Sequence, residues 1–110
     1  MPFGEPALMD EQQRADIRAA KALINYHIQS FKEALNAADL EPIKTEVKVS
    51  ETESYYLGTD FLLRHTNGHL VLEQQIYDLM KLLRIVTALS HLTNPNFIEG
   101  IARQAQTASA

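Results

Sequence analysis

The chain has 110 residues, a formal net charge of −4 and no cysteine. This length suits a single domain, 1–110, because two halves would each be too small to bury a stable core. The acidic balance, without any cluster of Lys and Arg, argues against nucleic acid or an anionic membrane as the main partner. The lack of cysteine removes disulfides, thiolate catalysis and cysteine-based zinc sites, and it fits a reducing cytoplasm.

Hydrophobic residues make up 45% of the chain and charged residues 22%, which is typical of soluble globular proteins. Only the two ends, about 1–9 and 104–110, have the composition of loose segments. The N-terminus lacks a basic stretch followed by a continuous apolar run, so no signal peptide is expected. No uninterrupted apolar stretch of about 18 residues predicts a membrane span. We therefore expect a cytoplasmic protein that does not associate with a membrane.

The first predicted element is an amphipathic helix over about 10–37. Asp10 is a good N-cap residue, and Pro42 cannot continue a helix, so these residues bracket the element. Apolar residues recur along it at an average step close to the helical period. They predict the buried face of this helix: Ile17, Ala20, Ile24, Ile28, Phe31 and Leu35.

From Ile43 the apolar period changes to two, as Ile43, Thr45, Val47 and Val49 alternate with charged residues. This pattern predicts a short strand with one wet face, and its charged outer side is typical of an edge strand.

The stretch 51–69 has two possible interpretations. In the first, a strand over Tyr55–His65 turns at Asn67-Gly68 into 69–72, with His65 opposite Leu70 and Leu63 opposite Leu72. In the second, a capping box at Ser50–Glu53 starts a short helix that Gly68 closes.

Gly58, Thr59 and Asp60 are poor helix formers, which favours the hairpin interpretation. The sequence therefore predicts an α+β fold. Two long helices flank a small antiparallel hairpin or meander, and a short helix follows at the C-terminus. The alternative is an all-α fold of three or four helices.

The second long helix is predicted to begin between Leu70 and Gln74 and to stop at Thr93-Asn94-Pro95. A third helix then starts with Asn94 as N-cap and continues to about Arg103. The second helix is apolar on most sides, whereas a surface helix of a small monomer needs only one apolar stripe. We expect the rest of the chain to leave one of its faces open, formed by Leu82, Ile85, Leu89 and Leu92.

An uncovered apolar helix favours a homodimer or an obligate protein complex, because leucine-sized side chains in water each forgo roughly 1.5–3 kcal/mol of burial. Tyr55 and Tyr56 are adjacent, so one of them must point away from the core if they lie in a strand. Exposed aromatic rings are typical binding anchors. The predicted protein-binding and dimer surface comprises Tyr55, Tyr56, Phe61, Leu79, Leu82, Ile85, Val86, Leu89 and Leu92.

No pattern in the chain predicts a reaction, a metal site or a cofactor. His65 and His69 have a spacing that binds zinc on a helix, but Asn67-Gly68 interrupts any helix between them. No serine lies in a nucleophile elbow, and the glycines do not cluster into a phosphate-binding loop. The sequence thus predicts a non-enzymatic protein, with a histidine-dependent metal binder or enzyme as a minor alternative.

The layout resembles that of the small cytoplasmic antiactivators that sequester LuxR-type quorum-sensing regulators. The resemblance covers about half of the chain: the amphipathic helix Arg14–Leu35 and the apolar segment LLRIVTALSHLTNPNFI. Those proteins are largely helical, so a hairpin at 43–72 is a departure from them. The resemblance implies a homodimer that binds a transcription regulator and blocks its dimerisation or DNA binding. The alternative function is a secretion chaperone or a phage or other assembly subunit, because these are also small acidic helical dimers.

Overall fold

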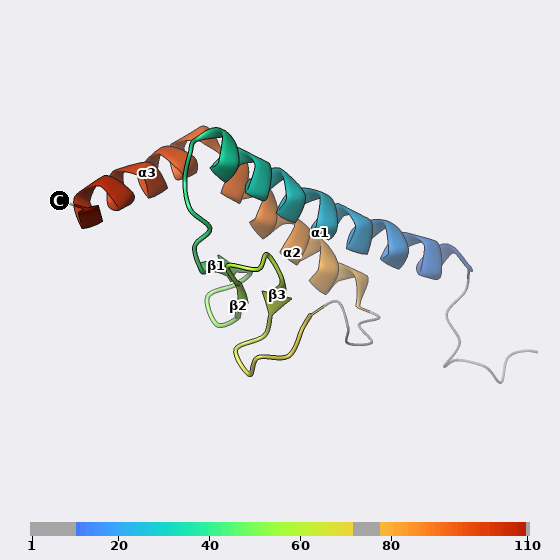
Figure 1. The fold of residues 1–110 in the computed structure, drawn as a ribbon. Helices are drawn as coiled ribbons and strands as arrows, with labels where there is room; N and C mark the ends of the chain where they lie inside the picture. Colours follow the sequence, from blue (N-terminus) through green and yellow to red (C-terminus); the bar gives the residue numbers. More distant parts are fainter. Residues whose placement is uncertain (1–10, 72–77, 110) are drawn as a thin grey trace, which may run out of the picture.

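The computed structural model describes residues 11–71 and 78–109. Helices α1 and α2 run side by side in the same direction, a small sheet lies against one side of them, and α3 extends beyond the C-terminal end of α1 (Figure 1). The predicted α+β class is confirmed, and the all-α alternative is wrong. The elements are α1 (Glu11–Ala37), β1 (Thr45–Lys48), β2 (Ser54–Leu57), β3 (Leu63–Arg64), α2 (Leu79–Ser90), the 3₁₀ turn η2 (His91–Thr93) and α3 (Pro95–Ser109).

Helix α1 buries the apolar stripe that its periodicity predicts, from Ile17 to Leu35. It ends in a Schellman arrangement: the N–H of Leu40 donates to the carbonyl of Leu35, and that of Asp39 to Asn36. Asp39 takes the left-handed conformation, with a φ of 59°, that glycine usually supplies at this position. The predicted N-cap, Asp10, lies outside the described residues.

The sheet is antiparallel with the order β1-β2-β3. Thr45 lies opposite Leu57 and Val47 opposite Tyr55, and all four side chains are buried against the helices. The alternating strand predicted after Ile43 is confirmed, and it lies at the edge of the sheet as expected.

The single strand predicted over Tyr55–His65 is wrong, because the chain reverses in its middle. Leu57 of β2 pairs with Leu63 of β3, and the N–H of Gly58 donates to the carbonyl of Leu62 at 3.1 Å. Asp60 fixes this turn, because its carboxylate accepts the backbone N–H of Leu62 at 3.1 Å. It also accepts hydrogen bonds from Nη1 and Nη2 of Arg64 at 3.0 and 2.8 Å. Gly58, Thr59 and Asp60, which argued against a helix, are also the residue types that form turns.

A second reversal does occur at Asn67-Gly68, but its predicted register is wrong by one residue. Arg64, not His65, lies opposite Leu70. The loop holds three residues instead of two, since His65 N donates to His69 O and Gly68 adopts a φ of 91°. Val71 therefore takes the buried position that was expected for Leu72, which lies outside the described residues.

Helix α2 begins later than predicted, at Leu79. Asp78 has an extended backbone and is its N-cap, accepting the N–H of Lys81 at 3.2 Å. The helix spans 12 residues, so it is not the second long helix that was expected from Leu70. Leu70 instead lies in the bridge to Arg64, and 72–77 fall outside the described residues.

The open face expected on this helix is also wrong. Leu82, Ile85 and Leu89 are fully buried, and Leu92 in η2 is nearly so. They join the core that α1 and the inner face of the sheet provide, because both of these neighbours converge on the same stripe of α2.

Helix α3 starts where it was predicted, with the side chain of Asn94 accepting the N–H of Asn96 at 2.8 Å. It continues to Ser109 instead of ending near Arg103. Arg103 pairs with Glu99 one turn earlier at 3.0 Å, and the residues that follow include good helix formers. None of the helices among the described residues combines the length and apolarity needed to cross a bilayer.

Burial on α2 yields a direct stability prediction. Ile85→Ala should lower the free energy of unfolding by roughly 2–5 kcal/mol, because a fully enclosed isoleucine leaves a cavity. Leu83→Ala, on the exposed side of the same helix, should cost less than about 1 kcal/mol. Urea denaturation of both variants checks this difference, and equal costs would contradict the burial of Ile85.

Candidate protein-binding face

The two helices share a flank that faces away from the sheet, which we call the helical face. On α1 the opposite flank carries Lys32, which reaches Phe61 of the sheet, and on α2 it carries Lys81, which reaches Glu53. Residues three or four positions apart lie on the same side of a helix, so the side of each helix opposite Lys32 or Lys81 can be identified from the sequence spacing. From Ala19 onward the helical face comprises Ala19, Leu23, Tyr26, His27, Ser30 and Ala34 from α1, and Leu79, Leu83, Val86 and Ser90 from α2, and one turn before Ala19 the same flank of α1 carries Asp16.

Large apolar side chains of the helical face are exposed to solvent. The exposed fractions are 43% for Leu23, 64% for Tyr26 and 38% for Leu83, and Met80 at the margin is 62% exposed. These ten residues include no Asp, Glu, Lys or Arg, and Asp16 lies at the N-terminal margin of the face. Exposed apolar surface framed by polar residues marks sites of protein interaction, so this face is the strongest candidate site in the described part of the chain.

The structure separates the sequence-predicted site residues on the helices into two groups. Leu79 and Val86 are half-buried and belong to the helical face. The remaining four are core residues that a partner does not reach in the folded chain: Leu82, Ile85, Leu89 and Leu92. Sequence reasoning missed Leu23, Tyr26 and Leu83. The sequence did contain an indication of this site: Leu23 and Tyr26 are large apolar residues that fall outside the buried apolar repeat of α1.

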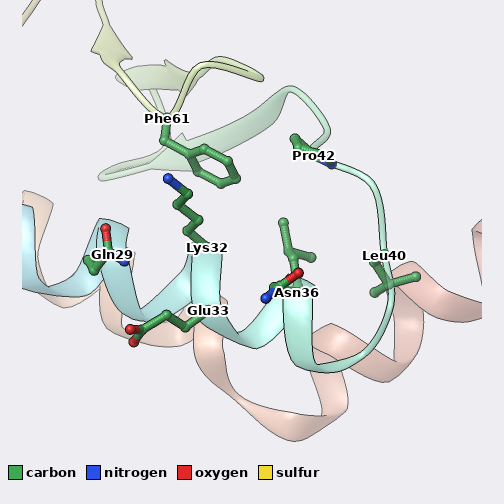
Figure 2. A pocket seen from close by; sticks show the side chains of 8 residues that line it. Gln29, Lys32, Glu33, Asn36, Leu40, Pro42 and Phe61 are labelled. Carbon is green, nitrogen blue, oxygen red and sulfur yellow. The ribbon is translucent and has the colours of Figure 1, made fainter.

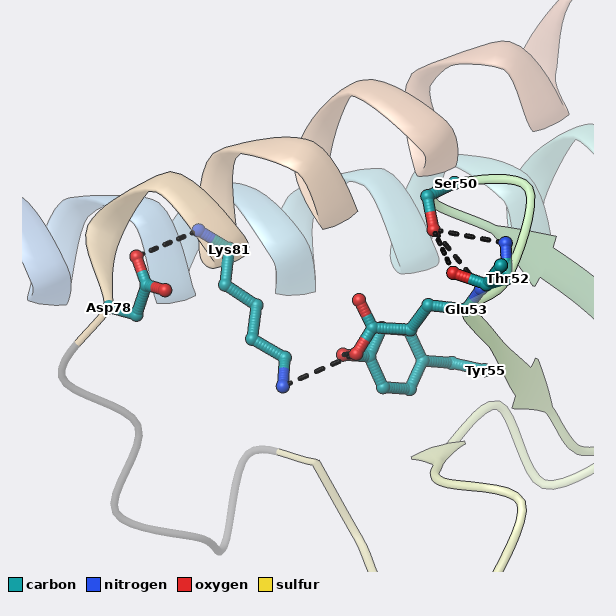
Figure 3. A network of polar contacts seen from close by, with 6 residues as sticks. All are labelled: Ser50, Thr52, Glu53, Tyr55, Asp78 and Lys81. Carbon is teal, nitrogen blue, oxygen red and sulfur yellow. Dashed lines mark hydrogen bonds and ion pairs between the residues drawn. The ribbon is translucent and has the colours of Figure 1, made fainter.

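Tyr55 points into the core. Its hydroxyl donates to Glu53 Oε2 at 3.0 Å, and Lys81 Nζ lies 3.4 Å from the same oxygen (Figure 3). Ser50 Oγ shapes the adjoining turn by accepting the N–H groups of Thr52 and Glu53 at 3.3 and 3.1 Å. This network ties β2 to α2, so Tyr55 has a structural role in place of the predicted partner-binding one.

The charges of this network follow from its hydrogen bonds. The hydrogen bond from the Tyr55 hydroxyl is the largest single cause that lowers the pKa of the Glu53 carboxyl below its usual 4.5, and Lys81 lowers it further. Burial, followed by the bond to Glu53, raises the pKa of Tyr55 above its usual 10.0. The carboxylate is therefore held ionised next to the ammonium of Lys81.

Tyr56 lies on the outer face of the sheet, which confirms that one of the two adjacent tyrosines points away from the core. Lys44 Nζ lies 4.8 Å from the centroid of its ring. A shallow hollow of about 380 Å³ adjoins the ring, lined also by the Asp60–Arg64 pair.

Phe61 borders a groove of about 330 Å³ between the C-terminal half of α1 and the segment that follows it (Figure 2). Lys32 Nζ lies 5.8 Å from the ring centroid, and the Phe31 ring lies 6.4 Å away. Phe61 has a φ of 60°, which costs a bulky residue about 1–3 kcal/mol unless its surroundings hold it. The three rings predicted for the site therefore occupy three separate places: the core, the outer sheet face and this groove.

His65 and His69 flank the second hairpin turn, where His65 N donates to His69 O at 2.8 Å. His65 Nε2 is buried and accepts or donates no hydrogen bond to the described residues. Within 11–71 and 78–109, no group of three His, Asp or Glu side chains is arranged to hold a metal ion.

Comparison with protein-family models, with curated proteins and with solved structures finds no match for this chain.

The Glu53 network gives a titration prediction. Tyr55→Phe should raise the pKa of Glu53 towards 4.5, because the tyrosine hydrogen bond is the largest single cause that lowers it. Since the folded-state pKa is lowered, the network stabilises the fold above the ordinary pKa of Glu53, and this stability is lost as the pH falls through the lowered value. Carboxyl NMR titration of Glu53 in the native chain and in Tyr55→Phe measures the change, and an unchanged pKa would contradict the role of this hydrogen bond.

Proposed function

We propose that this chain is a small, non-enzymatic regulatory protein that acts in the cytoplasm as a homodimer and sequesters a protein partner. The partner is a transcription regulator, and binding blocks its dimerisation or its DNA binding in the manner of an antiactivator. The observation that supports this proposal is the helical face, with its exposed Leu23, Tyr26 and Leu83 and no Asp, Glu, Lys or Arg from Ala19 onward.

The chemistry of the helical face suits an apolar protein surface. Burying its exposed leucine and tyrosine side chains releases about 25 cal/mol for each Å² removed from water. Because the ten residues carry no Asp, Glu, Lys or Arg, a partner is not required to desolvate or pair a charge there. Two parallel helices also present a shallow seam into which the apolar side of another helix can pack.

Dimerisation surfaces of transcription regulators offer the matching chemistry, since obligate dimer interfaces are more apolar than the rest of a protein surface. A protein that occupies such a surface prevents the regulator from pairing on its operator. The three-stranded sheet departs from the largely helical layout of the antiactivators that the chain resembles. The proposal accordingly rests on the helical face more than on that resemblance.

Acidic substitutions on the helical face should abolish partner binding. Leu23→Asp and Leu83→Asp each place a charge where the partner's apolar surface would have to desolvate it, so we expect at least about a tenfold loss of affinity each. Leu62→Asp is the matched control, because Leu62 is similarly exposed, at 44%, but lies in the hairpin turn of the sheet. Affinity is measured by calorimetry with the partner that the native protein captures from its own lysate.

Equal losses in all three variants, or none in the two helical ones, would contradict the assignment of the face. If the captured partner is a DNA-binding regulator, adding this protein should release it from its operator in a mobility-shift assay. A secretion substrate or an assembly component in its place would contradict the antiactivator role and favour the chaperone or assembly alternative.

A further inference from the structure

The outer edge of β1 carries unpaired backbone groups. Figure 1 shows β1 at one side of the sheet, and β2 is its only strand partner among the described residues. The N–H of Val49 donates to Glu53 across the ladder, so by alternation the backbone groups of Thr45, Val47 and Val49 face β2. Those of Glu46 and Lys48 point outward, where they form no hydrogen bond to another described element. Both of these side chains are exposed.

We propose that this edge pairs, antiparallel, with β1 of a second copy of the chain, with Glu46 opposite Lys48 of that copy. Hydrogen-bonding geometry requires outward-facing residues to lie opposite one another. The register that puts Glu46 opposite itself also puts Lys44 opposite Lys48, so both contacts oppose like charges. The register that puts Lys44 opposite Glu46 places Pro42, which has no N–H, opposite Lys48.

The register that puts Lys48 opposite itself again opposes like charges. The register that puts Glu46 opposite Lys48 satisfies charge, hydrogen bonding and burial together. A two-fold axis passes beside Val47, and each Glu46–Lys48 contact joins opposite charges across strands. Val47 meets its own copy and Thr45 lies opposite Val49, so the apolar inner face of the sheet continues through the axis. Lysines on an edge strand normally discourage pairing. Here Glu46 lies between Lys44 and Lys48, so registers that oppose like charges are disfavoured and the register with Glu46 opposite Lys48 is favoured.

This inference rests on the homodimer of the proposed function and specifies how it forms. The β1 edge lies in the sheet layer, whereas the helical face points away from the sheet, so self-pairing leaves the helical face free for the partner.

Charge reversal tests the register. The native chain should sediment as a dimer, at twice the 12.4 kDa of one copy. Glu46→Lys and Lys48→Glu each create two like-charge contacts and should weaken dimerisation at least about tenfold, while the double exchange restores the opposite pairs and should restore the dimer. Glu41→Lys, an equal charge change at an exposed position before β1, should have no effect. Sedimentation equilibrium measures all four.

Glu46→Pro provides a second test with the fold intact, because it removes an outward N–H that β2 does not use. It should give a monomer with the native circular dichroism spectrum. If the dimer persists in every variant at 46 and 48 but dissociates with Leu83→Asp, the edge pairing is overturned and self-association takes place on the helical face. A native chain that stays monomeric would overturn the edge pairing and the homodimer together. Partner binding by that monomer would leave the sequestering role standing.

Discussion

The fold depends on the packing of the apolar stripe of α2 against two neighbours. Leu82, Ile85 and Leu89 are enclosed by the stripe of α1 and by the inner face of the sheet. The sheet is too small to close around both helices, so it covers only one side of the pair (Figure 1). The contact that buries the core therefore also leaves the opposite flank of the helices open.

Tight turns set the size of the sheet. The reversal around Asp60 divides the single strand that was expected over Tyr55–His65 into β2 and β3, and the turn at Asn67-Gly68 ends β3. The short strands bring Tyr55 and Glu53 under α2, where Lys81 completes the polar network in Figure 3. This network fixes the sheet against the helix and uses the ring that, on sequence grounds, was a candidate for partner binding.

The proposed contacts use two kinds of chemistry on two layers of the molecule. The helical face offers apolar side chains without charge, and such a surface binds by exclusion of water. The β1 edge offers backbone hydrogen-bonding groups with alternating charge, and such an edge selects partners by register. Since the two surfaces belong to different layers, a dimer formed at β1 presents two helical faces to its partners.

The sequence by itself determined the elements that local chemistry specifies. It predicted the buried stripe of α1, the edge strand at Thr45–Lys48 and the start of α3 at Asn94-Pro95, because periodicity and capping depend on near neighbours. Only the tertiary structure decided the hairpin registers and which flank of α2 is open. The hydrophobic pattern of a helix shows how much of its surface is apolar. Which elements cover that surface depends on contacts between residues far apart in the chain.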